Sequence, residues 1–148
     1  MSLKDRLMAD LKQAMRAKDS VRRGTIRMIR SAVKYVEIDL QREATDEEIV
    51  EIIGREVKHR KEAIDLFRQG NRDDLVKERQ AEIAILEEYL PEQLSEQGIE
   101  TVLREIVADL DVQSPDQLGP VMREAMQRLK GRADGALVNQ IAREILSE

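Results

Sequence analysis

The sequence of 148 residues contains no cysteine and a single histidine. These absences exclude disulfides, thiol catalysis, cysteine-based zinc sites and any histidine cluster for a metal ion. Only 2% of the residues are aromatic, so Leu, Ile, Val, Ala and Met must fill any core. No apolar run approaches the roughly 18 residues of a membrane span, and the N-terminus lacks a signal peptide's apolar segment. We therefore expect a soluble cytoplasmic protein with no metal, cofactor or membrane partner.

Glycine and proline are also scarce, with 7 and 3 residues, whereas 37% of the residues are charged. This composition is typical of an all-helical protein with solvated charged faces. Apolar residues recur at helical spacing, and no stretch alternates as a strand would. We predict an all-α fold with a four-helix N-terminal domain over residues 1–94 and a small three-helix domain over residues 95–148.

Capping residues predict where the N-terminal helices begin and end. Ser2 can cap a helix over residues 3–17, and Asp19 a second helix to about Leu40. Thr45 and Glu48 form a capping box before a third helix that stops at Gly70. The fourth helix is expected to be capped by Asn71 and to end at Pro91.

The C-terminal domain is predicted from similar signals. After the new cap at Ser95, one helix covers about 96–110. We place the start of the next helix at Pro120, because a start at Ser114 would put this proline inside a helix at a cost of about 3 kcal/mol. Gly131 fits a left-handed position just past that helix, and Asp134 fits the cap of the last one.

Positive charge is concentrated at the N-terminus. Residues 1–36 contain 10 Lys/Arg and 3 Asp/Glu, although the whole chain has a net charge of −5. On the second helix, the expected apolar positions are Val21, Met28, Ala32 and Val36, with the neighbouring Thr25, Ile29 and Val33. Four cations fall within a sector roughly 60° wide, nearly opposite the stripe of Val21, Met28, Ala32 and Val36. The four cations are Arg23, Arg27, Arg30 and Lys34.

Two interpretations of these four cations stay open. Acidic residues of the third or fourth helix could screen them, or they could contact the phosphates of a nucleic acid and release its counterions. The scarcity of aromatic side chains argues against sequence-specific recognition of single-stranded RNA. A contact with the shape and phosphates of folded RNA is compatible with the pattern.

Other charged stretches have structural explanations. Lys58-His59-Arg60-Lys61 wraps most of one helical turn beside several acidic residues, which favours a solvated, ion-paired surface. No glycine-rich phosphate loop, catalytic serine motif or metal-ligand spacing occurs. The residues alone therefore predict no catalytic site.

A second group of cations surrounds the loop between the last two expected helices. Arg128, Lys130 and Arg132 lie beside it, and Arg143 follows one or two turns along the last helix. Backbone N–H groups at residues 135–137 could bind an anion, but Asp134 as a cap would use one or two of them and repel phosphate. The loop is therefore either a corner between two helices or a contact for RNA or a protein partner. Lys130 and Arg132 are the only residues of the loop to which the sequence assigns no structural role.

Several segments resemble the YqeY-like family. They are Leu11–Asp39, Glu87–Glu100 with Y-L-P-x-Q-L-S, and Leu118–Leu146 with L-K-G-R-A-D-G-x-L-V-N. The resemblance covers essentially the whole chain. It departs at Pro120, where the family pattern has lysine, and this weakens a phosphate role for that helix start.

The resemblance implies a tail-like C-terminal domain. The family's C-terminal portion is similar to the tail domain of one subunit of the glutamine-dependent amidotransferase acting on misacylated tRNA, where the tail helps engage tRNA and catalysis occurs elsewhere. The family is accordingly linked to carbon–nitrogen ligase activity with glutamine as amido-N-donor. The positions that match the tail motif are Lys130, Arg132, Asp134 and Leu137-Val138-Asn139.

We therefore expect a non-catalytic helical protein associated with tRNA, or with components of an amidotransferase or an aminoacyl-tRNA synthetase. One alternative is an autonomous carbon–nitrogen ligase or ligase component, although the sequence has neither a nucleotide-phosphate loop nor a glutaminase nucleophile. Another alternative is a helical adaptor that binds proteins without RNA.

Overall fold

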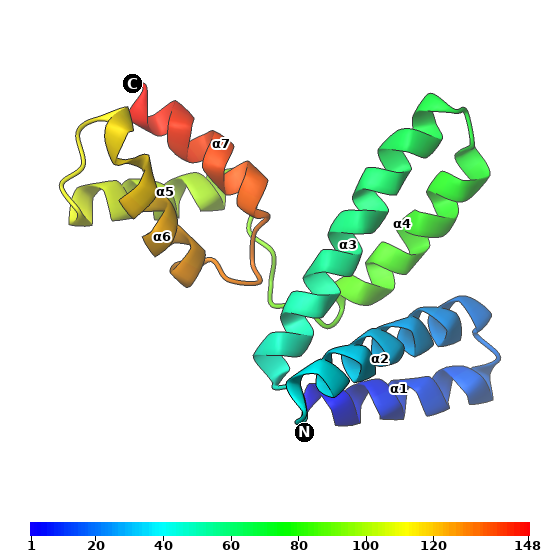
Figure 1. Cartoon of the computed structure of the whole chain (residues 1–148). Helices are drawn as coiled ribbons and strands as arrows, with labels where there is room; N and C mark the ends of the chain where they lie inside the picture. Colours follow the sequence, from blue (N-terminus) through cyan, green and yellow to red (C-terminus); the bar gives the residue numbers. More distant parts are fainter. The chain divides into compact units, whose positions relative to one another are not determined.

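The structure is a computed structural model that describes all 148 residues, and it contains seven α-helices, one short 3₁₀ helix and no strand (Figure 1). This confirms the predicted all-α fold. The chain divides into two compact units, Met1–Leu90 and Pro91–Glu148, each with its own aliphatic core. The sequence placed the division between residues 94 and 95. Leu94 lies in the second unit because it packs on that core and its N–H donates to the Arg132 carbonyl at 2.9 Å.

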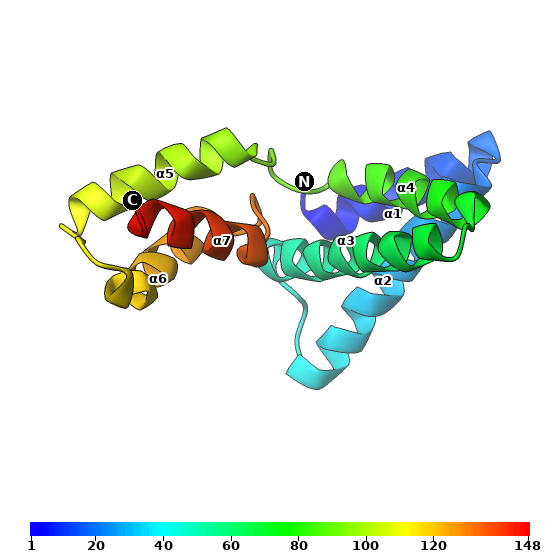
Figure 2. The same ribbon diagram turned by 90° about the horizontal axis from the view of Figure 1, so that it is seen from above.

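The first unit consists of two helical hairpins. They are formed by α1 (Leu3–Ala17) with α2 (Ser20–Leu40), and by α3 (Asp46–Gln69) with α4 (Asp73–Glu87). The helices α3 and α4 lie side by side in both views (Figures 1 and 2). The core between the hairpins is built from aliphatic side chains that are almost completely buried, among them Leu7, Ile26, Ile29, Ile49, Ile53 and Leu86.

Local capping forms at three of the four predicted helix starts of this unit. The Ser2 hydroxyl accepts from Asp5 N–H and the Asp19 carboxylate from Arg22 N–H, both at 3.1 Å. The Thr45–Glu48 capping box is complete. The prediction for Asn71 is wrong: it adopts a left-handed conformation with φ of 56°, and α4 begins after Arg72 without a side-chain cap. Asparagine tolerates this conformation, so it turns the chain between α3 and α4 instead of capping.

The buried face of α2 agrees with the predicted apolar positions only in part. Thr25, Ile29 and Val33 are buried as predicted, together with Ile26, which was not among the predicted positions, whereas Val21 and Met28 are 46% and 42% exposed. Because α2 packs against α1, α3 and α4, these neighbours decide which side is covered, and the centre of the buried face lies roughly a quarter turn from the predicted stripe. The cationic stripe of α2 therefore lies beside the core contact and not opposite to it.

The second unit packs three helices around one core. They are α5 (Glu96–Asp109), α6 (Leu118–Arg128) and α7 (Gly135–Leu146), with the 3₁₀ helix η1 (Pro115–Gln117) directly before α6. Six side chains of this core have no exposed surface: Ile99, Leu103, Ile106, Val121, Ala125 and Val138.

The start of α6 corrects the prediction for Pro120. The Ser114 hydroxyl accepts from Asp116 N–H at 3.2 Å, and η1 then continues into α6 at Leu118. Pro120 is thus the third residue of α6. The first four N–H groups of a helix have no acceptor within it, so a proline there loses no hydrogen bond. The penalty that argued against a start near Ser114 does not apply.

Candidate nucleic-acid interface

The α1–α2 hairpin carries an unusual number of cations without a counter-charge. Three of its cations are paired within the unit: Lys4 with Glu37, Arg6 with Asp10, and Arg22 with Asp19 and Glu88. The other seven have no carboxylate oxygen within 4.0 Å, and we call them the basic cluster. The basic cluster comprises Lys12, Arg16, Lys18, Arg23, Arg27, Arg30 and Lys34.

All four cations predicted on α2 belong to the basic cluster. No carboxylate of α3 or α4 forms an ion pair with Arg23, Arg27, Arg30 or Lys34. The carboxylates of these helices that do form ion pairs contact Arg42, Arg60, Arg72 and Arg79; they are Glu48, Glu56, Asp74, Glu78 and Glu82. Neither α3 nor α4 therefore neutralises the stripe through a direct ion pair.

A groove between α1 and α2 places part of the basic cluster beside apolar side chains. The groove has a volume of about 390 Å³, and we call it the α1–α2 groove. Lys4, Asp5, Leu7 and Met8 of α1 and Arg30, Val33, Lys34 and Glu37 of α2 line it.

The same side of the hairpin continues toward the turn between α1 and α2. Further along, the Arg27 guanidinium lies 3.9 Å from the sulfur of Met15. Helical spacing of four residues places Lys12 and Arg16 on the side of α1 that carries Met8. Cations from both helices therefore border one side of the hairpin.

One ion pair spans the groove. Lys4 Nζ lies 2.8 Å from a Glu37 carboxylate oxygen that also accepts from Ala44 N–H at 2.8 Å. The hydrogen bond from Lys4, followed by the one from Ala44, lowers the pKa of Glu37, and the same contact with Glu37 raises the pKa of Lys4. Both groups are therefore charged at neutral pH and are already engaged with each other.

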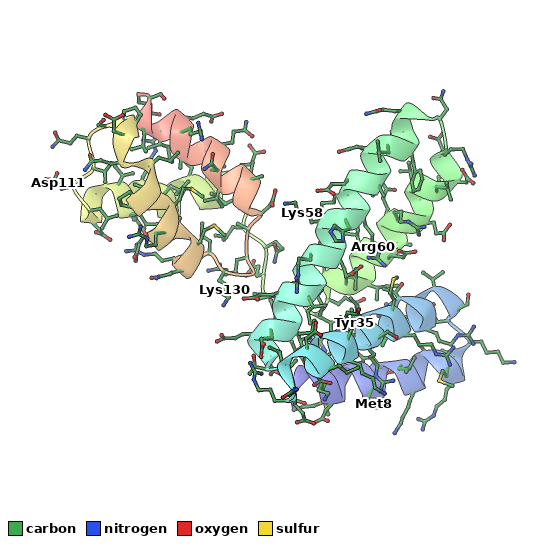
Figure 3. The ribbon with its side chains drawn as sticks, viewed as in Figure 1. Met8, Tyr35, Lys58, Arg60, Asp111 and Lys130 are labelled. Carbon is green, nitrogen blue, oxygen red and sulfur yellow. The ribbon has the colours of Figure 1, made fainter.

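Arg128 and Arg143, two of the cations predicted around the C-terminal loop, have partners within the second unit. Arg128 forms ion pairs with Glu124 at 3.0 Å and Asp109 at 3.2 Å, and these hydrogen bonds raise its pKa. Arg143 Nε donates to the Asn139 side-chain oxygen at 2.7 Å. Lys130 is exposed in the loop between α6 and α7 (Figure 3).

Arg132 has a structural role that sequence reasoning missed. Its Nε donates to the Glu92 carbonyl at 3.4 Å, and its own carbonyl accepts from Leu94 N–H. Beside it, the Gln93 side chain donates to the Gly131 carbonyl at 2.6 Å. The segment P-E-Q-L and the loop K-G-R-A-D-G, two of the most distinctive stretches of the sequence, are thus hydrogen-bonded to each other.

The predictions for Gly131 and Asp134 in this loop have different outcomes. Gly131 has a φ of 75°, which confirms the predicted left-handed position. Asp134 precedes α7 but forms no side-chain cap hydrogen bond, so it does not use the N–H groups of residues 135–137 as predicted. The loop is held by its contacts with residues 92–94 and not by an aspartate cap.

The basic stretch at Lys58–Lys61 contains an unforeseen buried residue. Arg60 is 6% exposed between α3 and α4 (Figure 3). Its guanidinium lies 2.6 Å from Glu82 and 2.8 Å from Glu56, and Arg79 pairs with the second oxygen of Glu82 at 2.6 Å. The prediction of a solvated surface is wrong for Arg60. The signal that could have revealed it is its position three residues after Val57 and four before Ile64, on the apolar side of α3.

Tyr89 of the Y-L-P-x-Q-L-S motif is also explained by packing. It is buried, its hydroxyl donates to Asp10, and the Arg6 guanidinium lies 4.6 Å above its ring. Burial and the bond to Asp10 raise its pKa. No three His, Cys, Asp or Glu side chains come together as a metal site, and none of the helices combines the length and apolarity that a membrane crossing requires.

The family of YqeY-like proteins matches residues 4–146. This chain belongs to the YqeY-like family. Among curated relatives of this YqeY-like protein is "Altered inheritance of mitochondria protein 41, mitochondrial" of Pyrenophora tritici-repentis, 31% identical over 144 residues, or 95% of this chain and 79% of the relative. Proteins of the same name from Lachancea thermotolerans and Kluyveromyces lactis are 36% identical over 112 and 113 residues, or 74% of this chain and 60% of each relative.

These relatives correct the predicted compartment. Their names describe mitochondrial proteins, which contradicts the expectation that this YqeY-like protein is cytoplasmic. The expectation relied on the lack of an apolar leader. Mitochondrial targeting segments are amphipathic and arginine-rich, so the lack of an apolar segment does not argue against mitochondria.

Proposed function

We propose that this protein is a non-catalytic, tRNA-associated helical protein and that its α1–α2 hairpin contacts RNA phosphates. The basic cluster is the observation that carries the proposal. Seven cations without ion pairs lie on one hairpin of a chain whose net charge is −5. Their mutual repulsion is relieved when a polyanion binds and releases its counterions.

The surroundings of the basic cluster favour contact with phosphates over recognition of bases. The chain has two tyrosines and one phenylalanine, and Tyr89 is buried. On α2 the sequence spacing separates Tyr35 from the cationic stripe by roughly a quarter turn. From Arg23 to Lys34 the stripe extends about 16 Å along the helix, which suits several phosphates of a folded RNA.

The family resemblance is the reason for proposing tRNA as the binding partner. It links the chain to tRNA-dependent amidotransferases, and components of such an enzyme or of an aminoacyl-tRNA synthetase would share the same tRNA. The carbon–nitrogen ligase activity associated with the family would then belong to the partner enzyme. In this arrangement the protein supplies tRNA affinity and no chemistry.

The test is titration of the full chain with unfractionated tRNA at two salt concentrations. We expect binding that weakens with salt, and a quadruple variant, Arg23→Glu, Arg27→Glu, Arg30→Glu and Lys34→Glu, that binds far more weakly. The logarithmic salt slope should fall by about 0.7–0.9 for every phosphate that the variant no longer neutralises. The absence of binding at low salt, or unchanged binding by the variant, would refute the proposal.

A matched control variant separates the effect of the basic cluster on tRNA affinity from the effect of net charge. Arg55, Lys58, Lys61 and Lys77 are exposed on α3 and α4 and form no ion pair within the protein. Reversing these four charges changes the net charge equally, yet we expect it to retain most of the affinity. Equal losses in both variants would show that net charge, and not the basic cluster, governs binding. Glutamine-dependent amidation of Glu-tRNA(Gln) by the purified protein would contradict a non-catalytic role.

A further inference from the structure

The α1–α2 groove combines an apolar floor with charged side chains of both signs from each helix. Leu7 and Val33 form the floor and are only 1% and 3% exposed, and the half-buried Met8 also lines the groove. Arg30 and Lys34 border the groove from α2, and Asp5 borders it from α1. None of these three charged groups has an ion-pair partner. Met8 is labelled in Figure 3.

We infer that this groove binds one unpaired ribonucleotide, with its phosphate at Arg30 and Lys34, its base against Met8 and a ribose hydroxyl donating to Asp5. The inference rests on the proposed RNA contact and assigns it a defined subsite. A volume of about 390 Å³ lies within the roughly 300–1,000 Å³ of small-ligand sites.

The charges define the orientation of the nucleotide. Glu37 is occupied by Lys4 and by Ala44 N–H, so Asp5 is the groove carboxylate that can accept from a new donor. A phosphate is repelled by Asp5 and attracted to Arg30 and Lys34 on the other helix. A carboxylate that accepts from a ribose hydroxyl is a recurring way of holding nucleotides.

The apolar contact with Met8 requires a nucleotide that is not base-paired. A base in a duplex is stacked on both sides, so only an unpaired nucleotide can present its face to Met8. A methionine sulfur contacts any aromatic face, so the groove should show little preference among the four bases. Because the 2′-hydroxyl is absent from DNA, the Asp5 contact should distinguish ribonucleotides from deoxyribonucleotides.

The experiment compares four probes by fluorescence anisotropy and competition. They are an RNA hairpin closed by a non-nucleotide linker with two unpaired 3′ ribonucleotides, the same hairpin with blunt ends, the hairpin with two unpaired 3′ deoxyribonucleotides, and free adenosine monophosphate as competitor. For the wild type we expect the ribonucleotide overhang to bind about threefold to tenfold more tightly than the blunt hairpin. The deoxyribonucleotide overhang should lose most of this advantage.

Three variants assign the contacts. Met8→Ala should remove the preference for the overhang while leaving blunt-hairpin binding unchanged. Asp5→Asn should bind all RNAs slightly more tightly, because a negative charge is lost, but should no longer distinguish ribose from deoxyribose. Asp39→Asn removes an exposed carboxylate of α2 outside the groove and is the matched control, which should keep the ribose preference.

The outcomes separate the inference from the proposed function. Equal affinity of the wild type for overhang and blunt hairpins would overturn the nucleotide subsite and leave the phosphate contact standing. Failure to bind any hairpin would refute the proposed function itself. Competition by free adenosine monophosphate that disappears in Met8→Ala would support the ribonucleotide site and show that it also accepts a nucleotide outside an RNA chain.

Discussion

Replacing Arg60 with methionine tests whether its buried ion network holds α3 and α4 together. The substitution keeps the apolar stem of the side chain and removes the guanidinium. That group donates to Glu82 at 2.6 Å, to the Glu56 carboxylate at 2.8 Å and to the Glu56 carbonyl at 3.1 Å, and it lies 3.3 Å from the sulfur of Met28. Its loss leaves two carboxylates facing a largely buried space.

The magnitude follows from what remains around those carboxylates. Breaking one side of a buried ion pair typically costs about 3–5 kcal/mol. Glu82 is 12% exposed but keeps Arg79 at 2.6 Å, and Glu56 is 25% exposed and partly solvated. We therefore expect Arg60→Met to lower the free energy of unfolding of the first unit by about 3 kcal/mol, at the low end of that range.

The assay is the urea dependence of hydrogen exchange at buried amides of α3, which reports the stability of this unit. Lys58→Met is the matched control, because Lys58 is exposed without an ion pair, and it should change stability by no more than about 0.5 kcal/mol. The double variant Arg60→Met, Glu82→Met should recover much of the loss, because an apolar pair can replace a buried ion pair. A loss below about 1 kcal/mol for Arg60→Met would refute the reasoning, since exposed ion pairs contribute that little.

Three further predictions concern caps and backbone. Hydrogen bonds from Arg42 and Thr45 lower the pKa of Glu48 to about 2 from its usual 4.5, so its contribution to stability is present above the usual value and is lost as the pH falls through about 2. The difference in thermal midpoint between wild type and Glu48→Gln should therefore shrink as the pH is lowered from about 5 to about 2, and a constant difference would contradict the assignment. Gly131→Ala places a side chain at a φ of 75° and should destabilise the second unit by about 1–2 kcal/mol in urea unfolding; an unchanged midpoint would argue against the left-handed turn. Pro120→Ala should alter stability by less than about 0.5 kcal/mol, because no hydrogen bond in the first turn depends on this position, and a loss of about 2 kcal/mol would disprove that account.

The starts of several helices were predictable because a capping side chain bonds a backbone N–H only three residues further along the chain. Ser2 with Asp5, Asp19 with Arg22 and Thr45 with Glu48 are each three residues apart, and all three caps form. The predicted cap at Ser95 also forms, because its hydroxyl accepts from Gly98 N–H at 3.1 Å. The predicted caps at Asn71 and Asp134 do not form. Either residue could cap a helix or turn the chain with equal ease.

The candidate site was predictable as a charge pattern but not as a geometry. The four α2 cations are visible in the sequence because their helical spacing is regular. Their lack of ion pairs depends on where the carboxylates of α3 and α4 point, and the groove beside them depends on how α1 packs on α2. Arg128 and Arg132 looked similar to these cations in sequence, yet both have partners within the second unit.

The sequence by itself determined that the chain is helical, where most helices begin, and that its N-terminal hairpin is rich in positive charge. These properties depend on composition and on interactions within about one helical turn. Tertiary structure decided which face of α2 is buried, that Arg60 lies inside while its neighbour Lys58 lies outside, and that Arg132 ties the C-terminal loop to residues 92–94. Such outcomes depend on side chains that are distant in the sequence, because burial and ion pairing are properties of the packed neighbours and not of the helix that carries the residue.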